Sequence, residues 1–419
     1  MSFTASLLLS AACAASHLEP HGFSRVKLAV LEELLPRPMP GCISDDELVE
    51  LERRLWALGQ FDDVKVARAG DAISVTVREK WTLIPIVDVG SSGKTLRDSY
   101  VFGSLMESNT AGRAMECGVY GAYYERAVSA ETWCDEHHQA ARRATFEGAL
   151  QYVGSGFVFD LDRRPDGGEP YTWERRRTGG RFGVRLPFFY GTAFRFAILP
   201  SAYHEQSRGE LPPGHLDRGW FAGVGLRVTR DRYEWHDLAP RGTRLSVELT
   251  PGGFFGDRRR DRHAALAQLL TAFRLTERTG LLINMVGEAV TPGDPNHSVL
   301  LGSIPAWRGS FGMIGGVRGL PDNRNRDAAH AFGNIELRHA FAVTPRFFIQ
   351  PAAFVDGGVY ARMNATGDVL RPEPALSVGG GVRVVPTFLA WLVPRIDAGR
   401  LLLPEPAWFF QFAFSQYLY

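Results

Sequence analysis

The sequence predicts a mainly β protein: an antiparallel transmembrane β-barrel over residues 81–419, preceded by a small α+β domain over residues 22–80. Its 45 glycines, 27 phenylalanines, 12 tyrosines and 9 tryptophans favour many strands joined by tight turns. Apolar residues occur in short alternating runs, and no run approaches the ~20 residues of a membrane-spanning helix. At roughly ten residues per tilted strand plus a connection, the second region would hold about sixteen strands.

The last strand favours a membrane barrel over a soluble sandwich, which could also bury an aromatic strand face. Large apolar residues alternate there with mostly small or polar ones, so that one face suits lipid contact. That face comprises Trp408, Phe410, Phe412, Phe414 and Leu418. The aromatic end of the strand resembles the C-terminal sorting signal of bacterial outer-membrane barrels, with Phe410, Phe412, Phe414, Tyr417 and Tyr419 as the residues concerned.

The tetrapeptide Val-Arg-Gly-Leu at residues 317–320 contains the candidate functional residue, Arg318. Two carboxylates, Glu336 and Asp356, follow it, each in an alternating stretch that places it on a polar strand face. In a membrane barrel, that face lines the lumen. A loop that carries Arg318 and Gly319 into the lumen would remove the arginine from water, and the carboxylates could compensate with charge-assisted hydrogen bonds. We therefore expect a loop latched inside the barrel; the alternative is a surface turn with an unpaired arginine.

The N-terminal domain contains one clearly marked helix. Ser44 and Glu47 form a capping-box pattern, leucines then recur at spacings of three and four, and Gly59 suits the position after the helix. Two alternating runs around a turn at residues 69–71 predict a hairpin, and a first strand is expected at residues 23–31. The predicted core includes Leu51, Leu55, Leu58, Phe61 and Val64.

Residues 1–16 are interpreted as an export signal, with a leucine core and small residues before the cleavage region, although no basic residue precedes them. Leu9 lies one residue too far upstream of Cys13 for a good lipoprotein signal. Removal of this segment would leave Cys42, Cys117 and Cys134, which allow at most one internal bridge. Cys117 and Cys134 could close the base of a loop, and unbridged thiols are the alternative.

The order strand, helical region, capped helix, strand, strand resembles a POTRA domain, the periplasmic module of barrel-assembly proteins. The stretch from Leu55 to Val64 is similar to the L-x-x-L-G-x-F-x-x-V of such domains. With its barrel, the chain resembles a short member of the BamA/TamA superfamily (bacterial surface antigen type), which also includes two-partner secretion transporters. The resemblance assigns Arg318 to the V-R-G-(F/Y) arginine, Glu336 to its first acidic partner and Asp356 to the F-x-D-x-G signature. Leu320 replaces the usual aromatic residue, and one POTRA-like module stands where principal assembly proteins have several.

The resemblance implies a protein of the bacterial outer membrane whose N-terminal domain lies in the periplasm. It implies an accessory assembly factor: the POTRA-like edge captures an unfolded client, and the barrel seam templates its insertion. Pro85, in the first expected barrel strand, would remove one hydrogen-bond donor from that strand. The alternatives are a secretion transporter of the two-partner type and a passive porin or structural barrel. The implied partners are unfolded outer-membrane polypeptides, outer-membrane lipid and a periplasmic partner of the POTRA-like domain.

The sequence indicates no enzyme, cofactor or metal site. It contains no nucleophile elbow, no phosphate-binding glycine loop and no paired-carboxylate cleft. No C-x-x-C pair occurs, and His137-His138 is interpreted as part of a solvated loop. A net charge of +1 with scattered arginines argues against a nucleic-acid partner.

Overall fold

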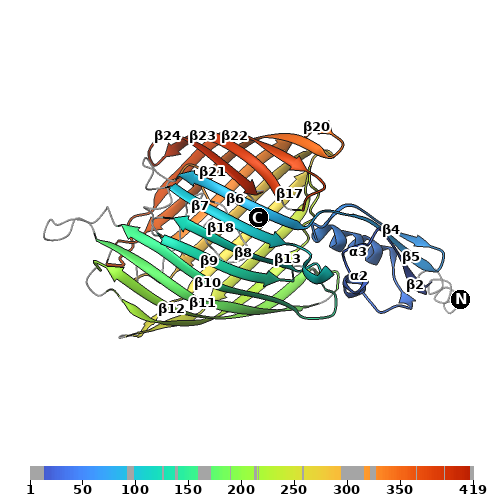
Figure 1. The fold of residues 1–419 in the computed structure, drawn as a ribbon, viewed down its shortest axis with the longest axis horizontal. Coiled ribbons are helices and arrows are strands. Elements are labelled where there is room, and N and C mark those ends of the chain that lie inside the picture. The colour runs from blue at the N-terminus through green and yellow to red at the C-terminus, as the bar shows by residue number, and fades with distance from the viewer. Residues whose placement is uncertain are drawn as a thin grey trace, which may run out of the picture.

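A computed structural model shows a β-barrel with a small mixed domain at one end (Figure 1). The structure describes residues 14–91, 99–124, 127–136, 140–158, 171–188, 190–211, 215, 217–256, 259–293, 316–320, 327–364, 366–390 and 392–415. No helix within these ranges is both long and apolar enough to cross a membrane.

The N-terminal domain packs two helices, α2 (Leu28–Leu34) and α3 (Asp45–Ala57), with a three-stranded sheet. The sheet has the order β2-β5-β4, with β2 parallel and β4 antiparallel to the central strand. Its strands are β2 (His17–His21), β4 (Phe61–Ala69) and β5 (Ala72–Glu79), while β1 (Ala14–Ala15) and β3 (Gly41–Cys42) pair separately. The five residues expected in the core, Leu51, Leu55, Leu58, Phe61 and Val64, are all buried in one cluster.

The capped helix and the hairpin form as predicted. Ser44 and Glu47 exchange both hydrogen bonds of the capping box, and Gly59 has a φ of 68° after α3. The expected strand at residues 23–31 is wrong, because Val30, Leu31 and Leu34 bury one face of helix α2 instead. The first strand of the sheet is β2, which ends immediately before Gly22 (φ 82°).

Nineteen strand elements form the closed barrel. They are β6 (Leu83–Ser91), β7 (Ser99–Glu107), β8 (Glu116–Tyr124), β9 (Ala127–Asp135), β10 (Thr145–Val158), β11 (Thr172–Pro187), β12 (Phe194–Gly209), β13 (Arg218–Asp231), β14 (Gly242–Thr250), β15 (Gly252–Gly256), β16 (Arg259–Asp261), β17 (Ala264–Arg274), β18 (Thr279–Val290), β19 (Asp327–His339), β20 (Phe341–Thr344), β21 (Phe347–Arg362), β22 (Glu373–Pro386), β23 (Leu392–Leu403) and β24 (Ala407–Ser415). A short 3-10 helix, Thr110–Gly112, lies between β7 and β8.

Three barrel strands are each interrupted and so count as two elements. β14 and β15 both pair with β13 and form one interrupted strand, while β17 pairs with β14 and β16 pairs with β15, so that β16 and β17 form the next. β19 and β20 both pair with β21 and form the third. The barrel therefore has sixteen antiparallel strands, which confirms the predicted fold class. β24 lies beside β6 and closes the barrel; we call this junction the seam.

Side chains alternate between the lumen and the outer surface. On β12, Phe194 and Ile198 are exposed whereas Ala197 and Leu199 are buried. On β24, Trp408 and Phe410 are 80% and 69% exposed, and Phe409 between them points inward. The outer apolar surface is the one that a lipid bilayer would cover.

The connection between β13 and β14, residues 232–241, folds across the end of the barrel next to the N-terminal domain. Tyr233 has no exposed surface and packs with Trp235 against Leu270, Ala272 and Leu282 of β17 and β18. Further round the same side of the barrel, Gln350 of β21 donates a hydrogen bond of 2.8 Å to the Leu238 carbonyl. This connection therefore covers the barrel end beside β17, β18 and β21.

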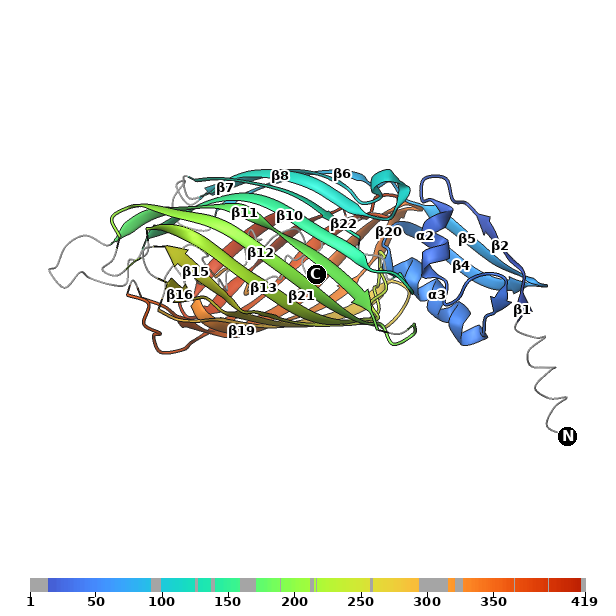
Figure 2. The same ribbon diagram turned by 90° about the horizontal axis from the view of Figure 1, so that it is seen from below.

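The N-terminal domain is seated on that end of the barrel (Figure 2). The Lys27 amide donates to the Gly112 carbonyl at 2.8 Å, and Arg143 forms a 2.7 Å ion pair with Glu33 of α2. Arg54 of α3 lies over the Tyr190 ring at 4.1 Å. Three different connections between barrel strands thus contact the helices of the domain or the segment just before them.

The residue 232–241 connection adds a partly buried ion pair to this contact. Lys80 Nζ lies 2.5 Å from Asp237 Oδ1, and the ring of Trp56 packs on His236 with centroids 4.3 Å apart. Burial raises the pKa of Asp237 above its usual value, and the Lys80 ammonium opposes that rise.

Lys80→Met is expected to loosen the domain from the barrel, because it leaves the partly buried Asp237 without its counter-charge. A raised pKa favours the docked state only while the carboxyl is protonated, so docking of the variant should strengthen as the pH falls from 8 toward the ordinary aspartate range of about 4. Hydrogen exchange of residues 232–241 measures this. Equal protection of variant and wild type at pH 8 would show that the ion pair does not hold the domain.

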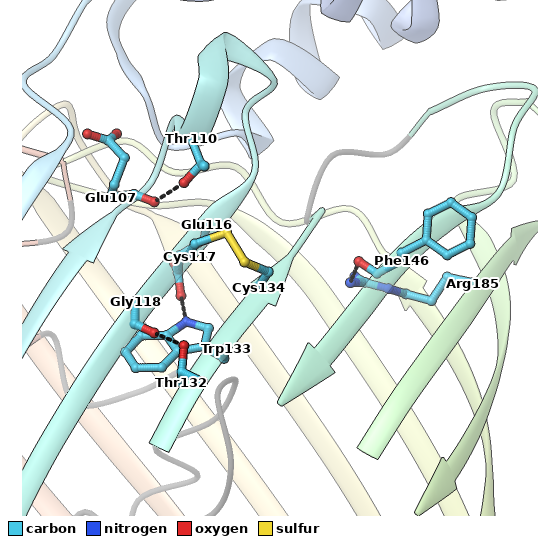
Figure 3. Close-up of a disulfide and its surroundings, with 10 residues drawn as sticks. All are labelled: Glu107, Thr110, Glu116, Cys117, Gly118, Thr132, Trp133, Cys134, Phe146 and Arg185. Carbon is cyan, nitrogen blue, oxygen red and sulfur yellow. Dashed lines mark hydrogen bonds between the residues drawn. A yellow bond between two sulfur atoms is a disulfide. The ribbon is translucent and has the colours of Figure 1, made fainter. Parts of the chain in front are cut away.

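A disulfide joins Cys117 of β8 to Cys134 of β9, directly opposite each other in the pairing register (Figure 3). Beside it, the Trp133 indole donates a 3.0 Å hydrogen bond to Glu116. In the full-length chain Cys42 is also disulfide-bonded, and its strand pairs with Ala14 and Ala15. The expectation of at most one bridge concerned the chain without residues 1–16 and stays a prediction.

A closed barrel of this kind resists the detergent of a denaturing gel until it is heated. The unheated protein is therefore expected to migrate faster than the boiled protein, because the folded barrel is more compact than the extended chain. A gel with paired unheated and boiled lanes tests this directly. A single band position, together with a largely helical circular-dichroism spectrum, would contradict the barrel.

Candidate functional site

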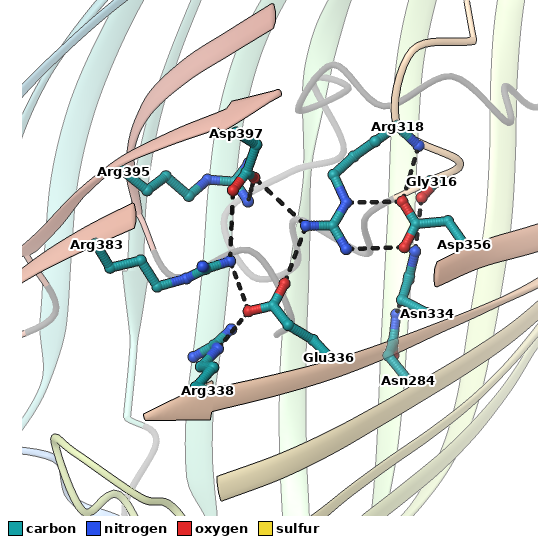
Figure 4. A network of polar contacts seen from close by, with 10 residues as sticks. All are labelled: Asn284, Gly316, Arg318, Asn334, Glu336, Arg338, Asp356, Arg383, Arg395 and Asp397. Carbon is teal, nitrogen blue, oxygen red and sulfur yellow. Dashed lines mark hydrogen bonds and ion pairs between the residues drawn. The ribbon is translucent and has the colours of Figure 1, made fainter. Parts of the chain in front are cut away.

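Residues 316–320, which we call the lumen loop, lie inside the barrel (Figure 4). Val317 and Leu320 are buried in an apolar cluster formed by both side chains and the inward faces of several strands. The strand residues in this cluster are Val286, Phe332, Tyr360, Ala375 and Leu401. Leu320, at the position where an aromatic residue was expected from the resemblance, thus fills an apolar site with an aliphatic side chain.

Arg318 makes its main contacts with Asp356 of β21. Its Nε and Nη2 atoms donate to the two carboxylate oxygens at 2.7 and 2.8 Å, and its backbone amide adds a third bond of 3.1 Å. The guanidinium also lies 3.3 Å from the ring centroid of Phe354, on the same strand. Both charged side chains have no exposed surface. A planar guanidinium fits this combination of a two-pronged carboxylate contact and ring stacking, which a lysine ammonium would not reproduce.

Two more carboxylates contact the same arginine. Its Nη1 atom lies 2.9 Å from Glu336 of β19 and 3.4 Å from Asp397 of β23. The structure thus brings together Arg318, Glu336 and Asp356, as the sequence led us to expect. Asp397 was missed, although its place in an alternating stretch with Arg395 marked it as another inward-facing residue.

Three further arginines surround these carboxylates and were also missed. Arg338 and Arg383 both contact Glu336, the second at 2.5 Å, and Arg395 lies 2.9 Å from Asp397. All three are buried. The cluster therefore contains four arginines and three carboxylates, and only Asp356 depends on Arg318 alone for an ion pair among the described residues.

A chain of amides holds the backbone of the lumen loop. Gln268 donates to Asn284 at 3.0 Å, Asn284 to Asn334 at 3.1 Å, and Asn334 to the Gly316 carbonyl at 2.8 Å. These side chains come from three successive strands, β17, β18 and β19. Because each buried amide has a partner, the chain fixes where the loop enters the site.

Gly319 connects the lumen loop to the last strand. Its φ is 83°, in the left-handed region that favours glycine, and a Cβ placed on it would lie 2.3 Å from Cδ1 of Phe409 in β24. The Phe409 ring in turn lies 6.3 Å from that of Phe354. Arg318 and Gly319 thus contact successive aromatic rings, and the second ring belongs to a strand of the seam.

Of the residues expected to form the C-terminal sorting signal, Phe410 faces outward with Trp408, and Phe412 is partly buried. Tyr417 and Tyr419 lie outside the described residues, as does the side chain of Phe414. Pro85 lies in β6, the first strand of the seam. Within the described ranges, no three His, Cys, Asp or Glu side chains gather as a metal ion would require; His137 and His138 are outside these ranges.

The geometry defines a class: a sixteen-stranded barrel with a charged loop anchored in its lumen and an α+β domain across one end. No family model matches the sequence, and no curated protein matches it. Solved structures share the fold. BamA from Haemophilus ducreyi lacking POTRA domains 1–3 is 10% identical with a TM-score of 0.51, over 96% of this chain and 84% of that one.

Two further solved structures match over 96% of this chain. CdiB from Escherichia coli is 13% identical with a TM-score of 0.62, over 76% of its chain. CdiB from Acinetobacter baumannii is 13% identical with a TM-score of 0.56, over 73% of its chain. At these identities the likeness concerns the fold, which is that of outer-membrane barrels.

Proposed function

We propose that this protein is an accessory assembly factor of the BamA/TamA type in the bacterial outer membrane. Its N-terminal domain lies in the periplasm and captures an unfolded outer-membrane polypeptide, which the seam between β24 and β6 then inserts laterally. The observation that carries this proposal is the contact between Gly319 and Phe409. It joins the anchored lumen loop to one of the two strands that must separate.

The barrel end beside the N-terminal domain favours lateral insertion over passage through the lumen. The residue 232–241 connection covers part of that end, with Tyr233 and Trp235 buried against β17 and β18. The N-terminal domain is seated on the same end and is tied to it by Lys80 and Asp237. A polypeptide entering the lumen would have to displace both, whereas a client at the seam would displace neither.

The β4 edge is the better candidate for client capture. Edge strand β2 is short and contains Pro20, which has no amide hydrogen. Strand β4 is longer, and its Val66 amide turns away from the sheet to Glu52 Oε2 of α3 at 3.3 Å. A client strand added at this edge would present main-chain carbonyls, which would accept the hydrogen bond of the Val66 amide in place of Glu52.

A secretion transporter is the second candidate, and the polar wall of the lumen favours it. Arg177 and Arg262 both bind Glu205 at 3.0 Å, and Arg227 lies 2.8 Å from Glu248. An extended polypeptide could slide along such a polar surface more easily than along an apolar one.

Depletion of the protein followed by quantification of the outer-membrane and secreted proteomes separates these functions. Loss of several barrel proteins from the membrane supports the assembly factor. Loss of one secreted protein with the membrane unchanged identifies a transporter. No change in either proteome, combined with ion conductance by the purified protein, contradicts both and identifies a passive barrel.

A further inference from the structure

We propose that the outer surface of β11, β12, β13, β15 and β16 binds an acylated, phosphorylated glycolipid of the outer leaflet. The site lies at the strand ends far from the N-terminal domain, since Tyr190, before β12, contacts that domain at the opposite ends. It rests on the proposed outer-membrane placement but not on the handling of any client. Three rows of outward side chains form this site. Within each row, residues of neighbouring strands are paired in register.

The row farthest from the N-terminal domain is basic. Arg176 of β11 pairs in register with Gln206 of β12, which pairs with Arg218 of β13. Arg208 lies one outward position further along β12, opposite Glu174. Glu174 binds Arg176 at 2.9 Å, whereas Arg208 and Arg218 are exposed and form no ion pair with any described residue. The row keeps a net positive charge that a phosphate group would complement.

The middle row is aromatic. His204 of β12 pairs in register with Trp220 of β13, and Trp220 pairs with Phe255 of β15. The His204 and Trp220 rings meet edge to face with centroids 5.2 Å apart. Arg259 of β16, opposite Phe255, places its guanidinium 5.7 Å from that ring. Aromatic rings of this kind mark the level where acyl chains meet head groups.

The row beneath the aromatic rings consists of small residues on four neighbouring strands. Gly180, Ala202, Ala222 and Gly253 are paired in register across β11, β12, β13 and β15. Ala202 and Ala222 project little beyond the backbone, so the outer surface is recessed there, between Leu150, which lies over Gly180, and the Phe255 ring, which lies over Gly253. An acyl chain or a glucosamine ring attached to a phosphate would fit against such a recess.

The position of the rows along β12 agrees with a membrane surface. Outward residues from Phe194 to Ala202 are apolar, and those from His204 to Arg208 are polar. At about 3.3 Å per residue and a tilt of about 45°, the apolar part spans roughly 20 Å of membrane. The arginines therefore lie just beyond the hydrocarbon, where lipid phosphates are found.

Strands β18 and β19 lack this combination at the same level. The outward residues at the corresponding ends of β18 and β19 are Gly287, Ala289, Ala329 and Ala331, with no cation among them. An outward arginine also lies over an aromatic ring at the far ends of β23 and β24, where Arg400 is 5.7 Å from Trp408, but three outward arginines, Arg176, Arg208 and Arg218, are grouped on β11, β12 and β13. The concentrated charge indicates a particular anionic lipid.

Native mass spectrometry of the detergent-solubilised full chain, titrated with diphosphorylated hexa-acyl lipid A, tests the proposal. We expect lipid A to bind at least about tenfold more tightly than phosphatidylglycerol, and Arg208→Gln with Arg218→Gln to remove about tenfold of that affinity. The control is Arg230→Gln, which alters an outward arginine over an aromatic ring at the opposite end of β13. It should leave lipid A binding unchanged.

Three outcomes would overturn the proposal. Equal affinity of wild type and the double variant would show that the basic row is not the site. Equal affinity for lipid A and phosphatidylglycerol would indicate nonspecific lipid contact. Competition by millimolar inorganic phosphate would indicate a free-anion site instead. The unheated gel band verifies that each variant is folded, and the single variants Arg208→Gln and Arg218→Gln replace the double variant if it is not.

Discussion

Replacing Arg318 by alanine is expected to destabilise the folded barrel by about 3–5 kcal/mol, the usual cost of removing one partner of a fully buried ion pair. Asp356 then keeps its burial but loses the partner that binds both of its oxygens. The sequence pattern gave Arg318 two carboxylate partners, Glu336 and Asp356, but in the structure Glu336 keeps Arg338 and Arg383 beside it. Asp397 likewise keeps Arg395. The loss is therefore concentrated at Asp356.

Urea titration in lipid vesicles, read from the fast-migrating gel band, measures this loss. Arg318→Lys should give an intermediate loss, because an ammonium retains the charge without the two-pronged geometry. Arg318→Ala combined with Asp356→Ala should recover part of the stability, since no buried carboxylate remains unpaired. Arg278→Ala, in the exposed turn after β17, is the control. If Arg318→Ala costs no more than this control, the buried pair does not anchor the loop.

Gly319→Ala is expected to cost about 2–4 kcal/mol, from left-handed backbone strain together with overpacking. The added Cβ would lie 2.3 Å from Phe409, so the loop or the last strand must shift. This variant therefore tests the contact between the loop and the seam without changing any charge.

Two companion variants separate the backbone strain from the collision. Gly293 also has a positive φ, of 96°, but a Cβ there would meet no atom within 4 Å. Gly293→Ala thus reports the backbone cost alone, and the same urea titration compares it with Gly319→Ala. Adding Phe409→Ala to Gly319→Ala should recover the difference, because it removes the ring that the Cβ would strike. Equal losses for the two glycine variants would contradict a close contact with Phe409.

The sequence alone predicted those residues of the site that lie in short motifs. Arg318, Glu336 and Asp356 stand in recognisable local patterns, and alternation alone places both carboxylates on inward faces. Arg383 and Asp397 lie on β22 and β23, whose positions relative to β19 and β21 depend on the register of the whole barrel. A register of that kind is set by tertiary packing, which a local pattern does not contain.

The fold, too, was predicted only in part from the sequence. About ten residues per strand gave the correct strand number because membrane thickness limits strand length. The unequal strand lengths, nine residues in β6 and sixteen in β12, were not predicted. In the N-terminal domain, residues 28–34 form a helix where a strand was expected, because a helical face of Val30, Leu31 and Leu34 reaches the core.

The site suggests how the lumen loop and the seam could act together during insertion. Arg318 holds the loop through Asp356, and Gly319 holds Phe409, so movement of β24 must disturb the same set of contacts. The buried contacts of the loop thus oppose opening of the seam. A client strand that pairs with the free edge would offset part of this cost through new main-chain hydrogen bonds.

Site-specific photo-crosslinking in living cells tests the central proposal most directly. A photoreactive residue at Trp408, on the outer face of the last strand, should capture newly made outer-membrane proteins. The same residue at Leu249 of β14, which also faces outward but lies far from the seam in the strand order, should capture none. Adducts at Trp408 alone are the predicted result. Adducts at both positions, or at neither while the client proteins still assemble through this protein, would contradict insertion at the seam.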